Sequence, residues 1–170
     1  LQGTVDMGAY ENLGCPSAAT DTLYVNASNM SPVDGSIWDN AFNKLQDALA
    51  LACGCPNTDF DIWVAKGTYY PDEGPGQTNN DRNSSFVMKN GVAIYGGFNG
   101  TETLLSERNW IANITTLSGD IDKNDMPNFV NNGGNAYHVI FNNNNGLNST
   151  AILDGFTVSG GNANGSSFNG

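Results

Sequence analysis

The stretch SSFVMKNGVAIYGGF, residues 84–98, decides the fold that we expect for this chain. Two short apolar runs, at 86–88 and 92–95, flank the turn Lys89-Asn90-Gly91. Runs of this kind around a glycine-containing turn predict two β-strands. Similar phrases return at 115–122, 137–142 and 151–162. Strands that start roughly every 20 residues predict a solenoid, in which stacked coils contact only their neighbours.

The composition fits a soluble, turn-rich β protein. The 170 residues carry six basic and 17 acidic side chains, for a net charge of −11 and a pI near 4.1. This balance excludes nucleic acid as a partner, because binding it needs a basic surface. The 21 glycines and the many asparagines favour tight turns. A hydrophobic content of 39% with clear strand runs argues against a disordered chain.

Three cysteines, Cys15, Cys53 and Cys55, indicate the compartment. We predict a disulfide between Cys15 and either Cys53 or Cys55, since Cys53 and Cys55 are too close to each other for a comfortable bond. Free thiols are the main alternative. Zinc is a weaker one, because His138 is the only histidine and lies far along the chain. A disulfide would favour an extracellular setting.

One amphipathic helix is predicted, from about Ile37 to Ala52. Ser36 serves as its N-cap, and its apolar stripe consists of Trp38, Phe42, Leu45, Leu49 and Ala52. A solenoid has an exposed end that must be covered, so we interpret the helix as the N-terminal cap. A helix that binds a partner is the alternative.

The first coil is expected at 60–71, with Ile62, Val64, Thr68 and Tyr70 on its inner side. Loops at 72–84, 99–114 and 123–136 separate the strands that follow. Loops of this length on a compact scaffold are often functional.

Several phrases then occur in an order typical of one family. They are YVN (24–26), DGSIWDNAF (34–42), LQDAL (45–49), IWVAKGTYYP (62–71), NGVAIYGGF (90–98), GTET (100–103), ERN (107–109) and LSGDI (117–121). Together they resemble right-handed parallel β-helix modules, of the pectin-lyase-like and polymorphic outer-membrane-protein kind, found in large bacterial cell-surface adhesins. GTVDMGAYE (3–11) resembles the phrase that closes such a module.

This resemblance implies an all-β, right-handed parallel β-helix with one N-terminal capping α-helix. Residues 1–20 would be the end of a preceding module plus a linker, 21–56 the first strand and capping helix, and 57–170 the first rungs of a β-helix that continues further. Neighbouring modules of the same polypeptide, or further copies of it, would then be partners.

The implied function is structural and adhesive. We expect a secreted protein at the cell surface whose rungs form a stiff stalk and whose loops contact glycans, delivered by a secretion machinery that the resemblance implies. The alternatives are a polysaccharide lyase or glycoside hydrolase with its active rungs outside this segment, and a filament subunit that stacks end to end. The basic residues form no catalytic constellation with carboxylates, and His138 is interpreted as a structural strand residue.

Two groups of residues are candidate binding sites. Asp120, Asp122, Asn124 and Asp125 place oxygen ligands as at the start of a Ca²⁺ loop, which makes Ca²⁺ the one candidate cofactor. The stretch lacks the glycine and the glutamate of an EF-hand, and the alternative is that these side chains only form turns. Trp110 and Tyr70 are the candidate glycan contacts, against the alternative that they pack on the strands.

Overall fold

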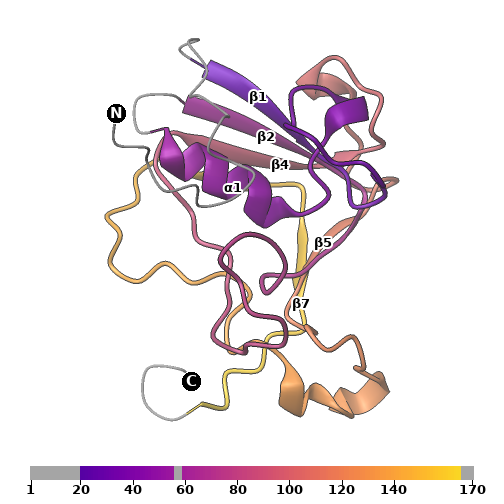
Figure 1. The fold of residues 1–170 in the computed structure, drawn as a ribbon. Helices are drawn as coiled ribbons and strands as arrows, with labels where there is room; N and C mark the ends of the chain where they lie inside the picture. The colour runs from indigo at the N-terminus through magenta and orange to yellow at the C-terminus, as the bar shows by residue number, and fades with distance from the viewer. Residues whose placement is uncertain (1–19, 56–58, 166–170) are drawn as a thin grey trace, which may run out of the picture.

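The computed structural model describes residues 20–55 and 59–165 and has a mostly-β fold with two parallel sheets and one α-helix (Figure 1). The predicted end of a preceding module therefore lies outside the described residues, apart from Thr20. One sheet has the strand order β1-β2-β4-β6, formed by Thr20–Val25, Asp59–Ala65, Val92–Phe98 and Ile152–Asp154. The other has the order β3-β5-β7, formed by Gly67–Tyr69, Thr115–Ser118 and Thr157–Ser159.

Successive parts of the chain visit the two sheets in turn. After β1, each of three stretches gives one strand to each sheet: β2 and β3, then β4 and β5, then β6 and β7. All pairings between these strands are parallel, so each strand lies beside its counterpart from the next stretch. A crossover must join parallel neighbours, and here that crossover runs through the other sheet.

A third set of parallel contacts joins the segments around Phe86 and Ile140, which form an isolated bridge. The amide of Phe86 donates to the carbonyl of Val139 at 2.9 Å, and the amide of Phe141 donates to that of Phe86 at 3.0 Å. The predicted strands at 86–88 and 137–142 therefore lie side by side, although they pair at a single bridge rather than as continuous strands.

The core lies on one face of the four-stranded sheet. Leu23, Ile62, Ile94 and Leu153 occupy paired positions on the four strands, and the first three are almost fully buried. On β2, Phe60 and Val64 are buried on the same side as Ile62. The opposite side of β2 is covered as well in its second half, where Trp63 and Ala65 are buried. Burial of such a side chain stabilises a fold by about 1.5–3 kcal/mol.

Of the four positions expected on the inner side of the first coil, two are buried and two are not. Ile62 and Val64 are buried, but in β3 the buried residue is Tyr69, while Thr68 is exposed and Tyr70 half-buried. The corner between β2 and β3 interrupts the alternation, so the strand resumes with the opposite phase. The hydroxyl of Tyr69 donates to the carbonyl of Ala65 at 2.9 Å, and burial raises its pKa.

The helix is shorter than predicted. Helix α1 spans Leu45–Gly54, and only a 3₁₀ turn, Trp38–Asn40, precedes it. The intervening backbone is extended because Phe42 forms a parallel bridge with Val25. The N-cap prediction is also wrong, since the hydroxyl of Ser36 donates to the Asp34 carboxylate instead.

Helix α1 packs against β1 and β2, which lie at one end of the larger sheet (Figure 1). Its buried apolar residues are Leu45, Ala48, Leu49 and Ala52. The free edge of β1 is covered as well, since the amides of Tyr24 and Asn26 donate to the carbonyls of Gly35 and Phe42 at 2.8 and 2.7 Å. Within the described residues, no helix is long and apolar enough to cross a membrane.

Candidate functional site

The larger sheet carries a row of aromatic side chains that points away from the core. Tyr24, Trp63 and Tyr95 occupy paired positions on β1, β2 and β4, and Asp154 continues the row on β6. Each follows a core residue by one position, so strand alternation places it on the opposite face. We call the following set the outer aromatic surface: Tyr24, Trp38, Trp63, Tyr95, Phe98, Arg108 and Trp110. Within it Trp63 and Phe98 are buried beneath their neighbours, Tyr24, Trp38 and Tyr95 are half-buried, and Trp110 is exposed.

The rings of this surface contact one another closely. Trp63 and Phe98 are stacked with centroids 4.7 Å apart, and Tyr24 meets Trp38 edge-on at 4.8 Å. Tyr24 and Trp63 are 5.6 Å apart. Aromatic pairs of this geometry contribute about 0.5–1.5 kcal/mol beyond burial, so the surface is ordered before any ligand arrives.

Arg108 links the row to the exposed indole of Trp110. Its guanidinium carbon lies 5.0 Å from the ring centroid of Tyr95 and 5.2 Å from that of Trp110. Its Nη2 donates to Asp154 Oδ2 at 2.9 Å. Trp110 is 55% exposed and borders an open groove of about 480 Å³, lined also by Leu104, Leu105, Ser106 and Arg108.

The loop that carries Arg108 and Trp110 is held by its own acidic side chains. The Glu102 carboxylate accepts from the amides of Asn99, Gly100 and Thr101 at 2.6–3.0 Å. Burial acts to raise the pKa of Glu102, but these backbone hydrogen bonds outweigh it and hold the pKa below its ordinary value. The indole of Trp38 also donates to the carbonyl of Glu102 at 2.9 Å.

Close backbone contact also fixes the start of this loop. Gly97 has φ +97°, and a Cβ there would lie 2.8 Å from the backbone of Trp110. The amide of Asn109 donates to the carbonyl of Gly97 at 2.7 Å. Glycine is therefore required for the loop to fold back over the sheet.

The charge around this surface favours an uncharged ligand. Asp61 lies in the same sheet, and burial raises its pKa. Burial also raises the pKa of Tyr95, and the charge of Asp61 raises it further. The one cation of this surface, Arg108, is already paired with Asp154. An anionic ligand would therefore meet the negative charge of Asp61 without a free cation to compensate it.

The second predicted glycan contact, Tyr70, does not belong to the outer aromatic surface. The ammonium of Lys123 lies 4.4 Å from its ring centroid. Lys123 also donates to Glu73 at 2.6 Å, and Lys44 pairs with the same carboxylate. Tyr70 thus lies in a junction that ties the 72–84 loop to the 123–136 loop.

The predicted calcium ligands are bonded mainly within their own turn. Asp120 accepts from the amide of Asn124 at 3.0 Å, and Asp122 accepts from the side chain of Asn124 at 2.8 Å. The carboxylate of Asp125 accepts from the Asn135 amide group at 2.8 Å. In the described part of the chain, no three acidic, histidine or cysteine side chains are grouped to hold a metal. Calcium binding stays a prediction.

The cysteines differ in state. Cys55 is disulfide-bonded and buried, whereas Cys53 is exposed and free. Cys15, the predicted partner, lies outside the described residues.

Comparison with known proteins finds no matching family model, curated protein or solved structure. The family resemblance therefore stays a prediction, and the site must be judged on its geometry. The structure brings Trp110 together with six residues that were not predicted as site residues. A signal for three of them was present, because Leu23-Tyr24, Ile62-Trp63 and Ile94-Tyr95 repeat an aliphatic–aromatic pair at equivalent strand positions.

Proposed function

We propose that this chain is a structural and adhesive module of a secreted bacterial surface protein. In this proposal it is built as a right-handed parallel β-helix, and its outer aromatic surface contacts glycans. The observation that carries the adhesive role is the exposed indole of Trp110 at the end of an ordered aromatic row.

The repeated visits of the chain to both sheets support the β-helix. Each of three stretches supplies a strand to each sheet, and the Phe86–Ile140 bridge adds parallel contacts outside both sheets. Three-sided coils stacked in parallel would produce this set of pairings. Such a stack is stiff along its axis, which suits a stalk.

The chemistry of the outer aromatic surface supports a neutral glycan as its ligand. Indole and phenol rings combine a flat apolar face with a polar edge, as the alternating apolar and hydroxyl surfaces of a sugar require. The loop that carries Trp110 is already fixed by the hydrogen bonds of Glu102, so little conformational entropy is lost when a ligand binds to it. The nearby carboxylate of Asp61, which forms no ion pair within the described residues, opposes acidic glycans.

A glycan array probed with the folded chain tests this function. We expect binding to neutral oligosaccharides that Trp110→Ala abolishes and that Ile111→Ala retains. Ile111 is the matched control, since it is the next residue and is 80% exposed. Equal binding by both variants, or none by the parent chain, contradicts the adhesive role of this surface.

End-to-end stacking is a second candidate, favoured by the exposed strands at the far edge of both sheets. Val158 is 49% exposed and Ile152 is 37% exposed, and parallel strand edges of this kind pair readily with another chain. Sedimentation over a range of protein concentrations tests it. Growing assemblies that Val158→Asp dissolves would support stacking, and a monomer at all concentrations would contradict it.

A further inference from the structure

Asp61 lies on the outer side of the larger sheet, beside the outer aromatic surface. It precedes Trp63 by two residues on β2, so strand alternation places both side chains on the same side. Trp63 pairs with Tyr24 and Tyr95, which makes these two residues diagonal neighbours of Asp61, with Cα atoms about 8 Å away. The carboxylate therefore borders the aromatic row.

The Asp61 carboxylate has no partner in the described part of the chain. Its side chain forms no hydrogen bond there, and the ion pairs there involve other carboxylates. Its paired residues on β1 and β4, Thr22 and Ala93, have small side chains without charge. The side chain is half-buried, and burial raises its pKa. A carboxylate in this state destabilises the fold unless a group from outside compensates its charge.

Arg108 shows which group compensates a carboxylate on this side of the sheet. Its guanidinium carbon lies 5.0 Å from the ring centroid of Tyr95, and its Nη2 donates to Asp154 at 2.9 Å. Because β4 lies between β2 and β6, Asp61 and Asp154 are on opposite sides of Tyr95. Burial raises the pKa of Tyr95, and the charges of Asp61 and Asp154 raise it further. The ring thus has one neighbouring carboxylate with a cation and one without.

A cation from outside would complete the second arrangement. Carboxylates form their strongest hydrogen bonds with charged donors, and aromatic rings attract ammonium groups. The negative charge that opposes an anion at Asp61 favours a cation, as does the net charge of −11. An amino sugar with a free amine combines a ring that packs on aromatic side chains with a compact ammonium group.

We propose that the outer aromatic surface binds a glycan that contains amino sugar units with a free amine, and that Asp61 accepts hydrogen bonds from this amine. The inference rests on the proposed function, in which the same surface contacts a glycan through Trp110, and adds the chemical class of the ligand. Neutral units of the glycan contact the rings, and an amino sugar unit contacts Asp61.

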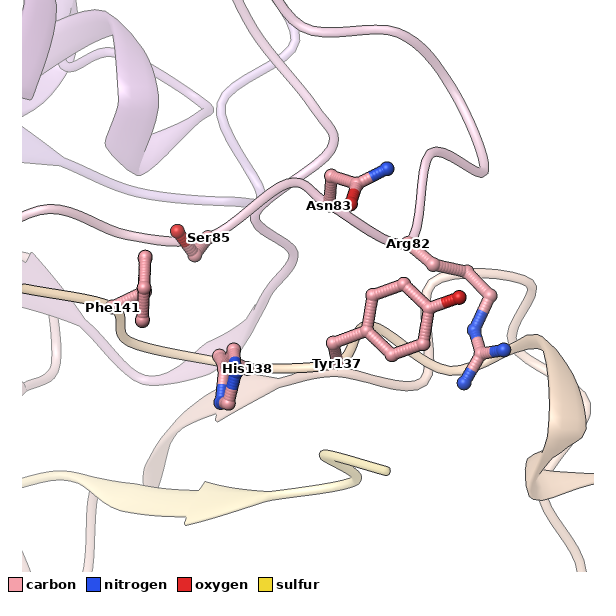
Figure 2. A pocket seen from close by; sticks show the side chains of 6 residues that line it. All are labelled: Arg82, Asn83, Ser85, Tyr137, His138 and Phe141. Atoms are coloured by element: carbon pink, nitrogen blue, oxygen red, sulfur yellow. The ribbon is translucent and has the colours of Figure 1, made fainter. Parts of the chain in front are cut away.

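A small cavity of about 200 Å³ is a competing location for a sugar unit. It lies between two segments that belong to neither sheet, and Figure 2 shows Ser85 on one segment and His138 on the other. Its charged lining residue, Arg82, is itself a cation. Since like charges repel, this cavity is a poorer location for an ammonium group than the neighbourhood of Asp61.

Calorimetric titration of the folded chain, at about pH 6 and about 0.15 M salt, tests the proposal. The probes are a glucosamine tetramer, cellotetraose, which has hydroxyls in place of the amines, and tetralysine, which has ammonium groups without sugar rings. We expect the glucosamine tetramer to bind at least about tenfold more tightly than either of the others.

Variants identify the residue that carries this preference. Asp61→Asn keeps the shape of the side chain and should lower the affinity for the glucosamine tetramer to that for cellotetraose, a loss of about tenfold or more. Asp125→Asn, the matched control, removes an equal charge from the 123–136 loop, which lies away from the larger sheet (Figure 1), and should change neither affinity. Trp110→Ala should weaken both.

Denaturation of the Asp61→Asn variant excludes a merely structural cause. The variant should unfold at the same or a higher denaturant concentration than the parent chain, because it loses a half-buried carboxylate that has no partner. A lower midpoint together with weaker binding of both tetramers would mean that Asp61 supports the fold and does not bind the amine.

The other outcomes separate this proposal from the proposed function. Equal affinity for the glucosamine tetramer and cellotetraose would overturn the role of the amine, while a loss of both in Trp110→Ala would still support the adhesive surface. Equal affinity for tetralysine, or an equal loss in Asp125→Asn, would reduce the preference to general attraction of cations. Binding that Ser85→Leu abolishes and Asp61→Asn preserves would place the ligand in the cavity of Figure 2. No binding of any probe would contradict both proposals.

Discussion

Arg108 and Asp154 are 46 residues apart in the sequence, yet Nη2 of the first lies 2.9 Å from Oδ2 of the second. The pair joins the 99–114 loop to the edge strand β6. The Arg108 side chain is 11% exposed and that of Asp154 is 52% exposed, so the two partners lie in different surroundings.

This asymmetry predicts unequal costs of removing the two partners. Asp154→Asn should reduce the free energy of unfolding by less than about 1 kcal/mol, since half-exposed ion pairs are weak. Arg108→Ala should cost about 1–2 kcal/mol, because contacts with Tyr95 and Trp110 are lost as well. Chemical denaturation measures both values. Equal losses would mean that the ring contacts of Arg108 add nothing to the contribution of the ion pair.

Gly97 should not tolerate a side chain. Gly97→Ala places a Cβ against the backbone of Trp110 and requires an unfavourable φ, so we expect a loss of about 1–3 kcal/mol. Gly133→Ala is the control, since a Cβ there meets nothing within 4 Å. Thermal unfolding of both variants checks this. A Gly97→Ala variant as stable as the control would contradict the close approach of the loop.

Glu73 should make stability depend on pH. Burial acts to raise its pKa, but hydrogen bonds and charges from Lys123 and Lys44 outweigh it and lower the pKa. A carboxyl group with a lowered folded pKa stabilises the fold above its unfolded pKa, about 4.3, and loses that contribution as the pH falls through the folded pKa.

The free energy of unfolding should therefore decrease as the pH is lowered below about 4. In the Glu73→Gln variant this decrease should be smaller. Denaturation curves from pH 7 to pH 2.5 give both slopes. Identical slopes would show that the junction with Lys123 and Lys44 does not contribute in solution.

The two cysteines near the end of α1 should respond differently to substitution. Cys53→Ser should change stability by less than about 0.5 kcal/mol, because this side chain is exposed and free. Cys55→Ser should cost about 2–4 kcal/mol, because it breaks a disulfide. Peptide mapping without reduction tests the predicted partner, Cys15. A Cys53–Cys55 peptide would contradict the pairing.

The sequence predicted the strands better than it predicted their partners. Short apolar runs bounded by turns mark β2 and β4, because most of the residues in each strand are buried. The shortened helix was missed because Phe42 satisfies the apolar spacing of a helix but is drawn into an extended bridge with Val25. Tertiary pairing overrides local periodicity there.

Only one residue of the outer aromatic surface was predicted as a site residue. Trp110 could be chosen because it lies in a polar loop, where an indole has no evident core to enter. Arg108 and Asp154 could not be paired from the sequence, since their contact depends on the register of β4 and β6. Tyr70 lies apart from this surface, beside Lys123, and its contact with a glycan stays a prediction.

Side-chain contacts measured by NMR test most directly the parallel strand pairing on which the outer aromatic surface depends. The account predicts a chain of nuclear Overhauser effects from Leu23 to Ile62, from Ile62 to Ile94 and from Ile94 to Leu153, with Val92 close to Phe60. Antiparallel pairing about the same Ile62–Ile94 contact would instead bring Val92 close to Val64. That result would contradict the parallel pairing of the larger sheet and, with it, the placement of the outer aromatic surface and the proposed β-helix.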